Sequence, residues 1–508
     1  RPLVSLTGDA SPAAAGRSTG PAAGDGRLVQ LTAVLEQAQP ALARAQQQLA
    51  AARAARGRLV GMQLPAGVAP LLSRFDQHEA TLALALTYAR GLPALLGAQG
   101  PRSYLLVYQD TADLRATGGY IGSASAITLD HGRLSQVDYE DSKQLQVPRS
   151  RSIPAPEPMF YYEGYGSLEL RDANYWPDFP TSARQIAHIY QVITGRHLDG
   201  VVAVQPSLVA YVLQGLGPLA VPAFHETVTA ANVVQRMEYY THDRPGAHAD
   251  LHRKRFVVAV NHALLSSLLH ASPARLAAVL PQVERAFADR MILASVDDPL
   301  VAQALQRLHW DGALRTDPGD YLAVLDQSLS DSKLNPFVAQ SISYEAQRRP
   351  DGGLDSRVTI TYVNRAPHRL TWLLDRVDYQ NYLRVAVPGQ SDLRDQAGYD
   401  DAFWPDDRER GRKLVAGYLA VPDDATRSVT LRYSVPPSAL AAVPGYRLVV
   451  QKQPGSRPAV VAVRVSAGGR TWTAHTVLRR DTVFSTPWHA PSGALHVSVD
   501  ATAPALSQ

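Results

Sequence analysis

The chain has 508 residues, of which 45% are hydrophobic and 19% are charged, so it can bury more than one core and is not typical of a disordered protein. The formal net charge is only +4, and basic and aromatic residues are not interleaved, which argues against a nucleic-acid partner. The chain contains no cysteine, which excludes disulfides, thiolate metal ligands and cysteine nucleophiles.

The first hundred residues predict a flexible lead-in and then a helical hairpin. Residues 1–27 are rich in Gly, Ala, Ser and Pro, as flexible segments are. Residues 28–100 contain two runs of helical spacing, and LEQAQPALARAQQQL in the first places leucines a heptad apart. The hairpin is either a stalk that raises the next domain from a membrane or a helical pair packed on a core. Because the sequence opens at Arg1 without a methionine, we expect a membrane anchor upstream of it.

Residues 101–335 predict a central α/β layered domain. Strand-like SYLLVY, YIGSASAITL and DGVVAVQ alternate with helix-like SARQIAHIYQVI and LVAYVLQGL. Residues 146–172 form a Pro- and Tyr-rich loop, and loops of this length are usually functional or mobile.

Residues 336–508 predict an immunoglobulin-like β-sandwich. Short alternating strands such as DSRVTITYVN, SVTLRYSV and VVAVRVSAG are separated by turns. The expected fold class is therefore multidomain α+β, with an N-terminal helical hairpin, a central α/β layered domain and a C-terminal β-sandwich.

The stretch YLLVYQDTADLRATGGY, residues 104–120, joins two strand-like runs through polar residues, whereas a plain hairpin needs only a two-residue turn. Gly118-Gly119 permits positive φ and an anion-binding nest of amides, and Arg115 can clamp a phosphate bidentately. Asp110 and Asp113 can supply oxygen ligands to Mg²⁺. The alternative is that Asp113 and Arg115 neutralise each other in an ordinary bulged connection.

The strand after this stretch is lined with small residues, Gly122 to Ser125. Such side chains leave room for something to lie against the strand.

A second unusual stretch is DLHRKRF, residues 250–256, at the start of an apolar helical stripe. Three cations in a first helical turn oppose the helix dipole, and a bound anion would resolve that conflict. The alternative is pairing of Arg253 with Asp250 and solvent exposure of Lys254.

A third stretch, NYWPDFPTSARQI at residues 174–186, predicts a helix start. Asp178 and Thr181 are good capping residues, and Pro180 suits the entry to a helix. A ligand role for Asp178 is the less favoured alternative. The chain has no Walker lysine motif, no G-x-S-x-G elbow and no H-E-x-x-H.

Several of these stretches together resemble the bacterial domain-of-unknown-function family 4012: YLLVYQDTADLRATGGYIGS, YWPDFPTSARQI, HLDGVVAVQPSLVAYVLQGLGPLAVP and YRLVVQKQPG. The resemblance covers most of residues 30–490, and R-x-T-G-G-[FY] is its most specific part, with Tyr120 where Phe is commoner. Members are envelope proteins, usually with an N-terminal anchor, so the resemblance implies an extracytoplasmic, cell-surface location. It supplies no activity.

The central region is also similar, more remotely, to LytR-CpsA-Psr proteins, extracytoplasmic ligases that move a glycopolymer from a polyprenyl-diphosphate carrier onto the cell wall with Mg²⁺. ADLHRKRFVVAVNHALL resembles their D-F-x-R-x-x-R-Q helix, which places Asp250 and Arg253 on motif positions. Arg255 stands one place short of the second arginine. Where that family has R-x-D-T, this chain has Arg115 followed by Ala116-Thr117.

The resemblance implies a single pocket in which Arg115, Asp113 and Arg253 carry the chemistry and the two arginines bind a diphosphate. The other implied ligand-binding residues are Thr117, Gly118, Gly119, Asp250 and Arg255. Mg²⁺ would be positioned by Asp113, Asp138 or Asp141.

The function expected from these features is binding of a polyprenyl-(pyro)phosphate carrier or a cell-wall glycopolymer at the cell envelope. Glycopolymer phosphotransfer is the reaction that the resemblance implies. The alternative is a non-catalytic surface, adhesion or assembly protein whose β-sandwich contacts protein partners. Nothing in the residues themselves decides whether the protein is an enzyme.

Overall fold

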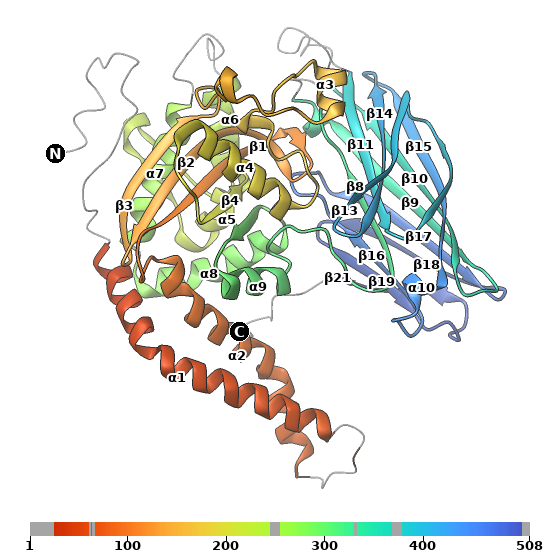
Figure 1. Ribbon diagram of the computed structural model, residues 1–508, viewed down its shortest axis with the longest axis horizontal. Helices are drawn as coiled ribbons and strands as arrows, with labels where there is room; N and C mark the ends of the chain where they lie inside the picture. Colours follow the sequence, from red (N-terminus) through yellow and green to blue (C-terminus); the bar gives the residue numbers. More distant parts are fainter. Residues whose placement is uncertain are drawn as a thin grey trace.

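The computed structural model of the protein describes residues 25–59, 62, 67–243, 254–329, 333–367 and 378–499. Within them the chain is a mixed α/β molecule, as expected, with a projecting helical hairpin, a layered central part and a two-sheet C-terminal part (Figure 1). None of the described helices combines the length and apolar composition that crossing a bilayer requires. The predicted lead-in lies almost entirely outside the described residues.

The N-terminal helices form the predicted hairpin. They are α1 (Asp25–Arg58) and α2 (Ala69–Leu95). Arg56 at the end of α1 pairs with Asp76 near the start of α2, with 2.8 Å between nitrogen and oxygen. Near the other end of α2, Tyr88 stacks on Trp310 of the central part, with ring centroids 6.1 Å apart. One end of the hairpin is therefore packed on the central part, while its tip projects beyond it (Figure 1).

The central part is built on a five-stranded sheet with the order β3-β2-β1-β4-β7. The strands are β1 (Arg102–Arg115), β2 (Gly118–Asp130), β3 (Arg133–Asp141), β4 (Gly200–Val204) and β7 (Ile292–Val296). β1 and β4 run parallel, and the other neighbours are antiparallel.

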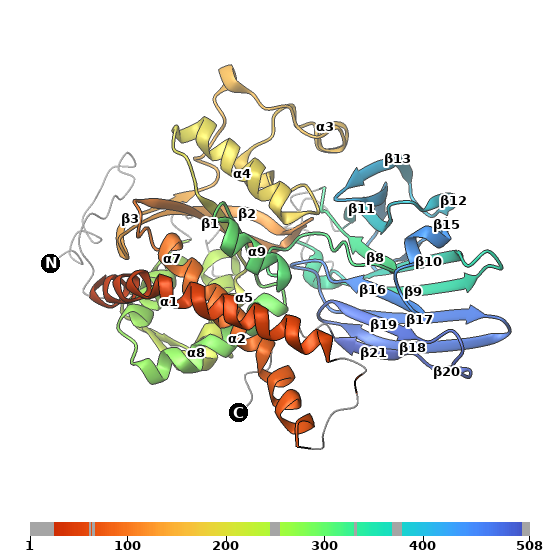
Figure 2. The same cartoon turned by 60° about the horizontal axis from the view of Figure 1, so that its bottom comes forward.

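Helices cover both faces of this sheet (Figure 2). On one face lies α4 (Phe179–Thr194), whose Phe179 and Ile186 pack with Leu105 and Ala124 of the sheet in a buried core. The other face carries α5 (Ser207–Leu216), α6 (Val233–Glu238), α7 (Arg255–Leu269) and α8 (Pro273–Ala288), with the short strands β5 (Leu219–Val221) and β6 (Glu226–Val228). The remaining helices of the central part are α3 (Glu157–Glu163), in the Pro- and Tyr-rich loop, and α9 (Pro299–Arg307).

The helices on the second face form an apolar cluster of their own instead of closing onto the sheet. Its members in the described residues, such as Val212, Phe256 and Val260, come from α5 to α8, the adjoining loops and β5–β6. None of those members comes from the five-stranded sheet. The two layers are therefore held apart, and a cavity lies between them.

The C-terminal part consists of two seven-stranded sheets that share one buried core. The first, in spatial order, contains β12 (Asp392–Ala397), β15 (Thr426–Val435), β10 (Leu354–Asn364), β9 (Val338–Arg348), β17 (Ala459–Ala467), β18 (Arg470–Leu478) and β20 (Gly493–Ala494). The second contains β13 (Asp401–Glu409), β14 (Arg412–Val421), β11 (Tyr379–Pro388), β8 (Asp320–Leu325), β16 (Tyr446–Gln451), β19 (Thr482–Thr486) and β21 (His496–Val499). A short helix, α10 (Pro437–Leu440), follows β15.

The two-sheet part begins earlier in the chain than residue 336, where the sequence placed its start. β8 lies between β11 and β16 in the second sheet, although it precedes the expected boundary. All six residues of β8 are buried. The run DYLAVL therefore lacks the alternation of apolar and polar residues that the other strands show, and it resembles a buried strand of an α/β domain.

The central and C-terminal parts are joined by buried ion pairs as well as by the chain. Arg290 donates to both carboxylate oxygens of Asp481 at 3.0 and 2.7 Å, and both side chains are almost fully buried. Arg480 pairs with Asp289 beside them. Breaking such buried pairs is costly, so these contacts hold the two parts in one arrangement.

Candidate functional site

A cavity of about 1040 Å³ lies between the five-stranded sheet and helices α5, α6 and α7. This volume is at the upper end of the range for small-molecule sites. Residues of α7 and its flanks line it from Lys254 to His270, so at 1.5 Å per residue it extends for about 24 Å along the helix. Most of the wall is apolar, with Leu106, Ile127, Leu134, Val137, Val209, Val212, Val257, Val258, Leu264, Leu265, Leu268 and Leu269.

The small residues of β2 help to make this space. Ser123 and Ser125 line the cavity, whereas Ala124 and Ala126 pack in the core on the α4 face, because successive side chains of a strand point to opposite faces. The sequence-based expectation that small residues leave room beside this strand is confirmed.

One end of the cavity carries two lysines, and we call it the mouth, formed by Lys254, Lys333, Gln109 and Asp110. Lys254 Nζ donates to the carbonyl oxygen of Gly122 at 2.6 Å and to Asp141 at 2.7 Å. Lys333 Nζ pairs with Asp110. The two ammonium groups therefore lie at the same end of the β1–β2 ladder, because Asp110 pairs with Tyr120, two residues or about 7 Å from Gly122.

Gln109 adds an unused donor to the mouth. Its side chain lines the cavity and is only 2% exposed. Its Nε2 has no hydrogen-bond partner among the described residues. Buried polar groups are almost always paired, so this amide is available to an acceptor atom of a ligand.

A bulge in β1 places Asp113 at the cavity wall. β1 pairs Asp110 with Tyr120 and then Leu114 with Gly119, so three residues of β1 are looped out of the ladder. Gly119 permits this approach, because a Cβ there would lie 2.0 Å from the carbonyl oxygen of Asp110. The hairpin itself closes through the two-residue turn Ala116-Thr117, because Arg115 pairs with Gly118, and the other polar residues of the stretch belong to the bulge.

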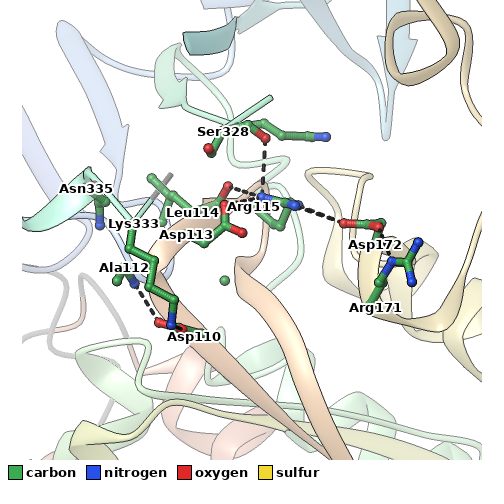
Figure 3. Close-up of polar contacts among 12 residues, drawn as sticks. Asp110, Ala112, Asp113, Leu114, Arg115, Arg171, Asp172, Ser328, Lys333 and Asn335 are labelled. Atoms are coloured by element: carbon green, nitrogen blue, oxygen red, sulfur yellow. Dashed lines mark hydrogen bonds and ion pairs between the residues drawn. The ribbon is translucent and has the colours of Figure 1, made fainter. Parts of the chain in front are cut away.

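Arg115 lies in a buried ion-pair network behind this wall (Figure 3). Its NH1 donates to Asp113 at 2.5 Å, and its Nε and NH2 donate to Asp172 at 3.1 and 2.9 Å. Burial raises the pKa of Asp113 to about 7, although Arg115 counteracts it. Burial also opposes the charge of Arg115, but Asp113 and Asp172 outweigh it and hold the pKa of the guanidinium above its ordinary value.

The placement of Arg115 differs from the expected diphosphate ligand. Its side chain is only 1% exposed, it is not part of the cavity wall, and two carboxylates neutralise it. Of the two sequence-based alternatives, the structure has the pairing of Asp113 with Arg115 in a bulged connection, with Asp172 as a further partner. Asp113 is the member of this group that reaches the cavity.

Thr117, Gly118 and Gly119 also lie outside the cavity wall, at the joint between the two parts of the molecule. The Nε2 of Gln453, from the C-terminal part, donates to the carbonyl oxygens of Arg115 at 3.1 Å and of Asp326 at 2.6 Å. Asn174 Nδ2 donates to the carbonyl oxygen of Gly119 at 2.8 Å. The R-x-T-G-G, NYWPDF and QKQPG stretches therefore meet at the joint and not around a ligand.

Of the expected Mg²⁺ ligands, Asp110 and Asp113 both line the cavity, but Asp110 is paired with Lys333. The others are held apart. Asp138 and Asp141 are three residues apart on β3 and face opposite sides of the sheet: Asp138 pairs with Arg196 and Asp141 with Lys254. Asp113 is engaged by Arg115. Among the described residues, no group of three or more His, Asp or Glu side chains could hold a metal ion. These carboxylates do not fit the Mg²⁺ site that the resemblance implies, since each is already paired with a cation of the chain.

The expected residues at the start of α7 are only partly described. Asp250 and Arg253 lie outside the described residues. Arg255 is exposed and is not part of the cavity wall. Its neighbour Lys254 is half-buried at the mouth, which differs from the alternative that left it exposed to solvent.

Sequence reasoning thus missed Lys254, Lys333 and Gln109. One signal was available: the chain has only five lysines against 45 arginines, because Lys and Arg together number 50. Three of those five, Lys143, Lys254 and Lys333, line the cavity. A residue type that is rare in the chain and gathers at one site indicates selection for its chemistry there. Asp178, by contrast, was correctly predicted as a helix cap, since its carboxylate accepts from the Thr181 amide at 3.3 Å.

Comparison with known proteins matches part of the central region. The family model described as a protein of unknown function (DUF4012) matches residues 99–241, which confirms the predicted family for this stretch. Among curated proteins, none matches the sequence. Similar solved structures include the Lin1025 protein from Listeria innocua, with 12% identity over 40% of this chain and 76% of that chain and a TM-score of 0.22. Protein gbs0355 from Streptococcus agalactiae has 14% identity over 42% of this chain and 73% of that chain, with a TM-score of 0.25. TagV of B. subtilis has 13% identity over 42% of this chain and 80% of that chain, with a TM-score of 0.24.

Proposed function

We propose that this protein, whose residues 99–241 match the DUF4012 family, binds a long-chain lipid with a phosphate or diphosphate head group, of the polyprenyl-phosphate class, at the cell envelope. The observation that carries the proposal is one cavity with two chemistries. An apolar wall extends for about 24 Å along α7, and two lysines stand at one end.

The apolar wall suits an isoprenoid tail. A cavity of about 1040 Å³ is at the upper end of the range for small-molecule sites, so it has room for several isoprene units. Burying one apolar CH₂ contributes about 0.8 kcal/mol, so the tail supplies most of the binding energy and little sequence specificity. A short polar metabolite would leave the apolar side chains of this wall in contact with water.

The mouth suits a phosphate head group. Lys254 and Lys333 are cations held in place by Asp141 and Asp110, and Gln109 offers a free N–H in the same wall. Phosphate oxygens accept hydrogen bonds from all three groups, and charge-assisted bonds of this kind are among the stronger ones.

The proposal is for binding rather than group transfer. The arginine that the resemblance to LytR-CpsA-Psr proteins assigned to the diphosphate, Arg115, is only 1% exposed and does not line the cavity. A lipid-binding envelope protein fits the cavity and also accommodates the alternative expectation of a non-catalytic assembly role.

The test is calorimetric titration of the full chain with farnesyl diphosphate, with and without Mg²⁺. We expect binding that Lys254→Met and Lys333→Met each weaken about 10- to 100-fold, the loss typical of one hydrogen bond to a charged group. Arg255→Met is the matched control, because this neighbouring cation is exposed and outside the cavity wall. Farnesol, which has the same tail without the phosphates, should bind all variants equally.

Two results would overturn the proposal. One is the absence of any binding by the folded protein. The other is equal affinity of the Lys254, Lys333 and Arg255 variants for farnesyl diphosphate, which would separate the mouth from the head group.

A further inference from the structure

At the end opposite the mouth, the wall of the cavity includes an exposed apolar side chain, and we call this end the portal. Leu265 of α7 lines the cavity and is also 41% exposed, so the apolar wall reaches the molecular surface there. Leu269 and His270, at the end of α7, complete this end of the lining. The portal lies well over half the length of α7 away from Lys254.

Large apolar side chains are exposed on the two helices beside the portal. On α8, Leu276 and Leu280 are 36% and 61% exposed and lie four residues apart, hence on one face of the helix. On α1, Leu31 and Val34 are 40% and 60% exposed. Together with Leu265, these four residues form what we call the portal rim.

The position of α1 places Leu31 and Val34 on the side of the portal. Arg27 donates to the carbonyl oxygen of Ala271, in the link between α7 and α8. Residues 27, 31 and 34 follow one another at helical spacing and share one face of α1. The apolar pair on α1 therefore faces the same region as the end of α7.

Exposed cations accompany the rim. Arg27 on α1 and Arg275 on α8 are both exposed. Leucines and valines mixed with arginines on adjoining helices are typical of surfaces that lie on an anionic bilayer, where apolar side chains enter the lipid and cations contact the head groups. A surface that faces water does not need exposed leucines and valines, and a purely apolar protein partner does not need exposed arginines.

We infer that the portal rim rests on an anionic lipid bilayer, and that a tail longer than the cavity leaves through the portal and ends in that bilayer. The inference rests on the proposed function and deepens it, because it makes the ligand a long-chain carrier lipid. A tail longer than the roughly 24 Å of the apolar wall exceeds the cavity. Its remainder avoids water only if the portal opens into lipid.

The experiment is flotation of the full chain with vesicles of phosphatidylcholine containing phosphatidylglycerol. We expect the protein to float with them, and the Leu280→Glu and Val34→Glu variants each to partition about tenfold more weakly, as the loss of one buried leucine-sized side chain implies. The matched controls are Leu71→Glu on α2 and Val460→Glu on β17, at positions 64% and 54% exposed but away from the rim. They should float like the unmodified protein.

Titration with farnesyl diphosphate separates this inference from the proposed function, because its short tail ends inside the cavity. The rim variants should bind it with unchanged affinity, since neither residue lines the cavity. If the unmodified protein does not float, or if the rim variants float as well as the controls, the portal inference fails, whatever the titration gives. If farnesyl diphosphate does not bind while flotation depends on the rim, the proposed function fails and the rim is only a membrane contact.

Discussion

The side-chain amide of Gln453 donates to the main-chain carbonyl oxygen of Arg115 at 3.1 Å, across 338 residues of chain. The same Nε2 donates to the carbonyl oxygen of Asp326, and its Oε1 accepts from the Asp326 amide. Gln453 thus ties the tip of the β1–β2 hairpin to the start of the C-terminal part. The most distinctive stretch of the sequence therefore acts in joining the two parts, next to the cavity instead of inside it.

Replacing Arg115 should destabilise the protein more than it affects the ligand. Arg115→Met leaves Asp113 and Asp172 buried without their cation, and breaking a buried pair typically costs about 3–5 kcal/mol. Without the guanidinium the pKa of Asp113 rises further above its ordinary value, because burial is then opposed by no cation. The native state therefore binds more protons than the unfolded state, and stability falls as pH rises. The destabilisation should be smallest near pH 4 and grow towards pH 7.

Urea unfolding of Arg115→Met and of the exposed-site control Arg255→Met over that pH range measures this effect. Equal stability of the two variants, or a loss of stability that becomes smaller as pH rises, would contradict the stabilising role of the ion-pair network around Arg115. Farnesyl diphosphate should still bind folded Arg115→Met, in contrast to the role that the sequence suggested.

Gly119 should be intolerant of a side chain. In Gly119→Ala the new Cβ would meet the carbonyl oxygen of Asp110 at 2.0 Å, so the bulge must open. We expect a loss of at least about 2 kcal/mol, as for other backbone-strain substitutions. Gly166→Ala is the matched control, because nothing lies within 4 Å of the corresponding Cβ. Thermal unfolding compares the two, and equal melting temperatures would mean that the close approach is not required.

Filling the cavity should reduce tail binding without disturbing the mouth. Ser125 is buried and lines the apolar section, so the ring of Ser125→Phe would occupy space meant for the tail. Affinity for farnesyl diphosphate should fall at least about tenfold, which corresponds to the loss of roughly two buried CH₂ groups. Binding of isopentenyl diphosphate, whose tail is a single isoprene unit, should change much less. An equal loss of affinity for both ligands would mean that the tail does not lie beside Ser125.

Stability should depend on pH through Asp320 in the C-terminal core. Burial raises the pKa of Asp320 to about 6 from an ordinary value of 3.8, although hydrogen bonds from Tyr344 and Tyr446 oppose the shift. Between these pH values the native state holds more protons than the unfolded state, so this group's contribution to stability falls as pH rises. A shift of this size corresponds to about 3 kcal/mol.

Asp320→Asn removes the titration, so its stability relative to the unmodified protein should increase by about that amount from pH 4 to pH 7. Denaturant unfolding at four pH values tests this, with Asp392→Asn on the exposed edge strand β12 as the control. If the stability difference for Asp320→Asn is constant across the range, Asp320 is not protonated near pH 6 in the native state.

Much of the local structure could be predicted because its causes are local. The heptad leucines predicted the α1–α2 hairpin, and Asp178 predicted the cap of α4. The pair Gly118-Gly119 predicted a close approach of two backbone segments. The start of the C-terminal part was placed too late, because β8 is buried on all sides and shows no alternation. The predicted roles of Arg115 and of the Mg²⁺ ligands depended on partners that spacing does not reveal, and Asp172 lies 57 residues away.

The sequence by itself determined which segments are helices and strands and showed that small residues leave room beside β2. It also placed Asp113, Arg115 and Gly118-Gly119 in one connection between two strands. Tertiary structure alone decided what these residues serve. It brought Gln453 and Asp172 to Arg115, which turned a candidate anion site into a joint. It also brought Lys254 and Lys333 to one end of the same cavity. The physical reason is that periodicity and turn chemistry act over a few residues, whereas a charge takes its role from whichever distant group folding places beside it.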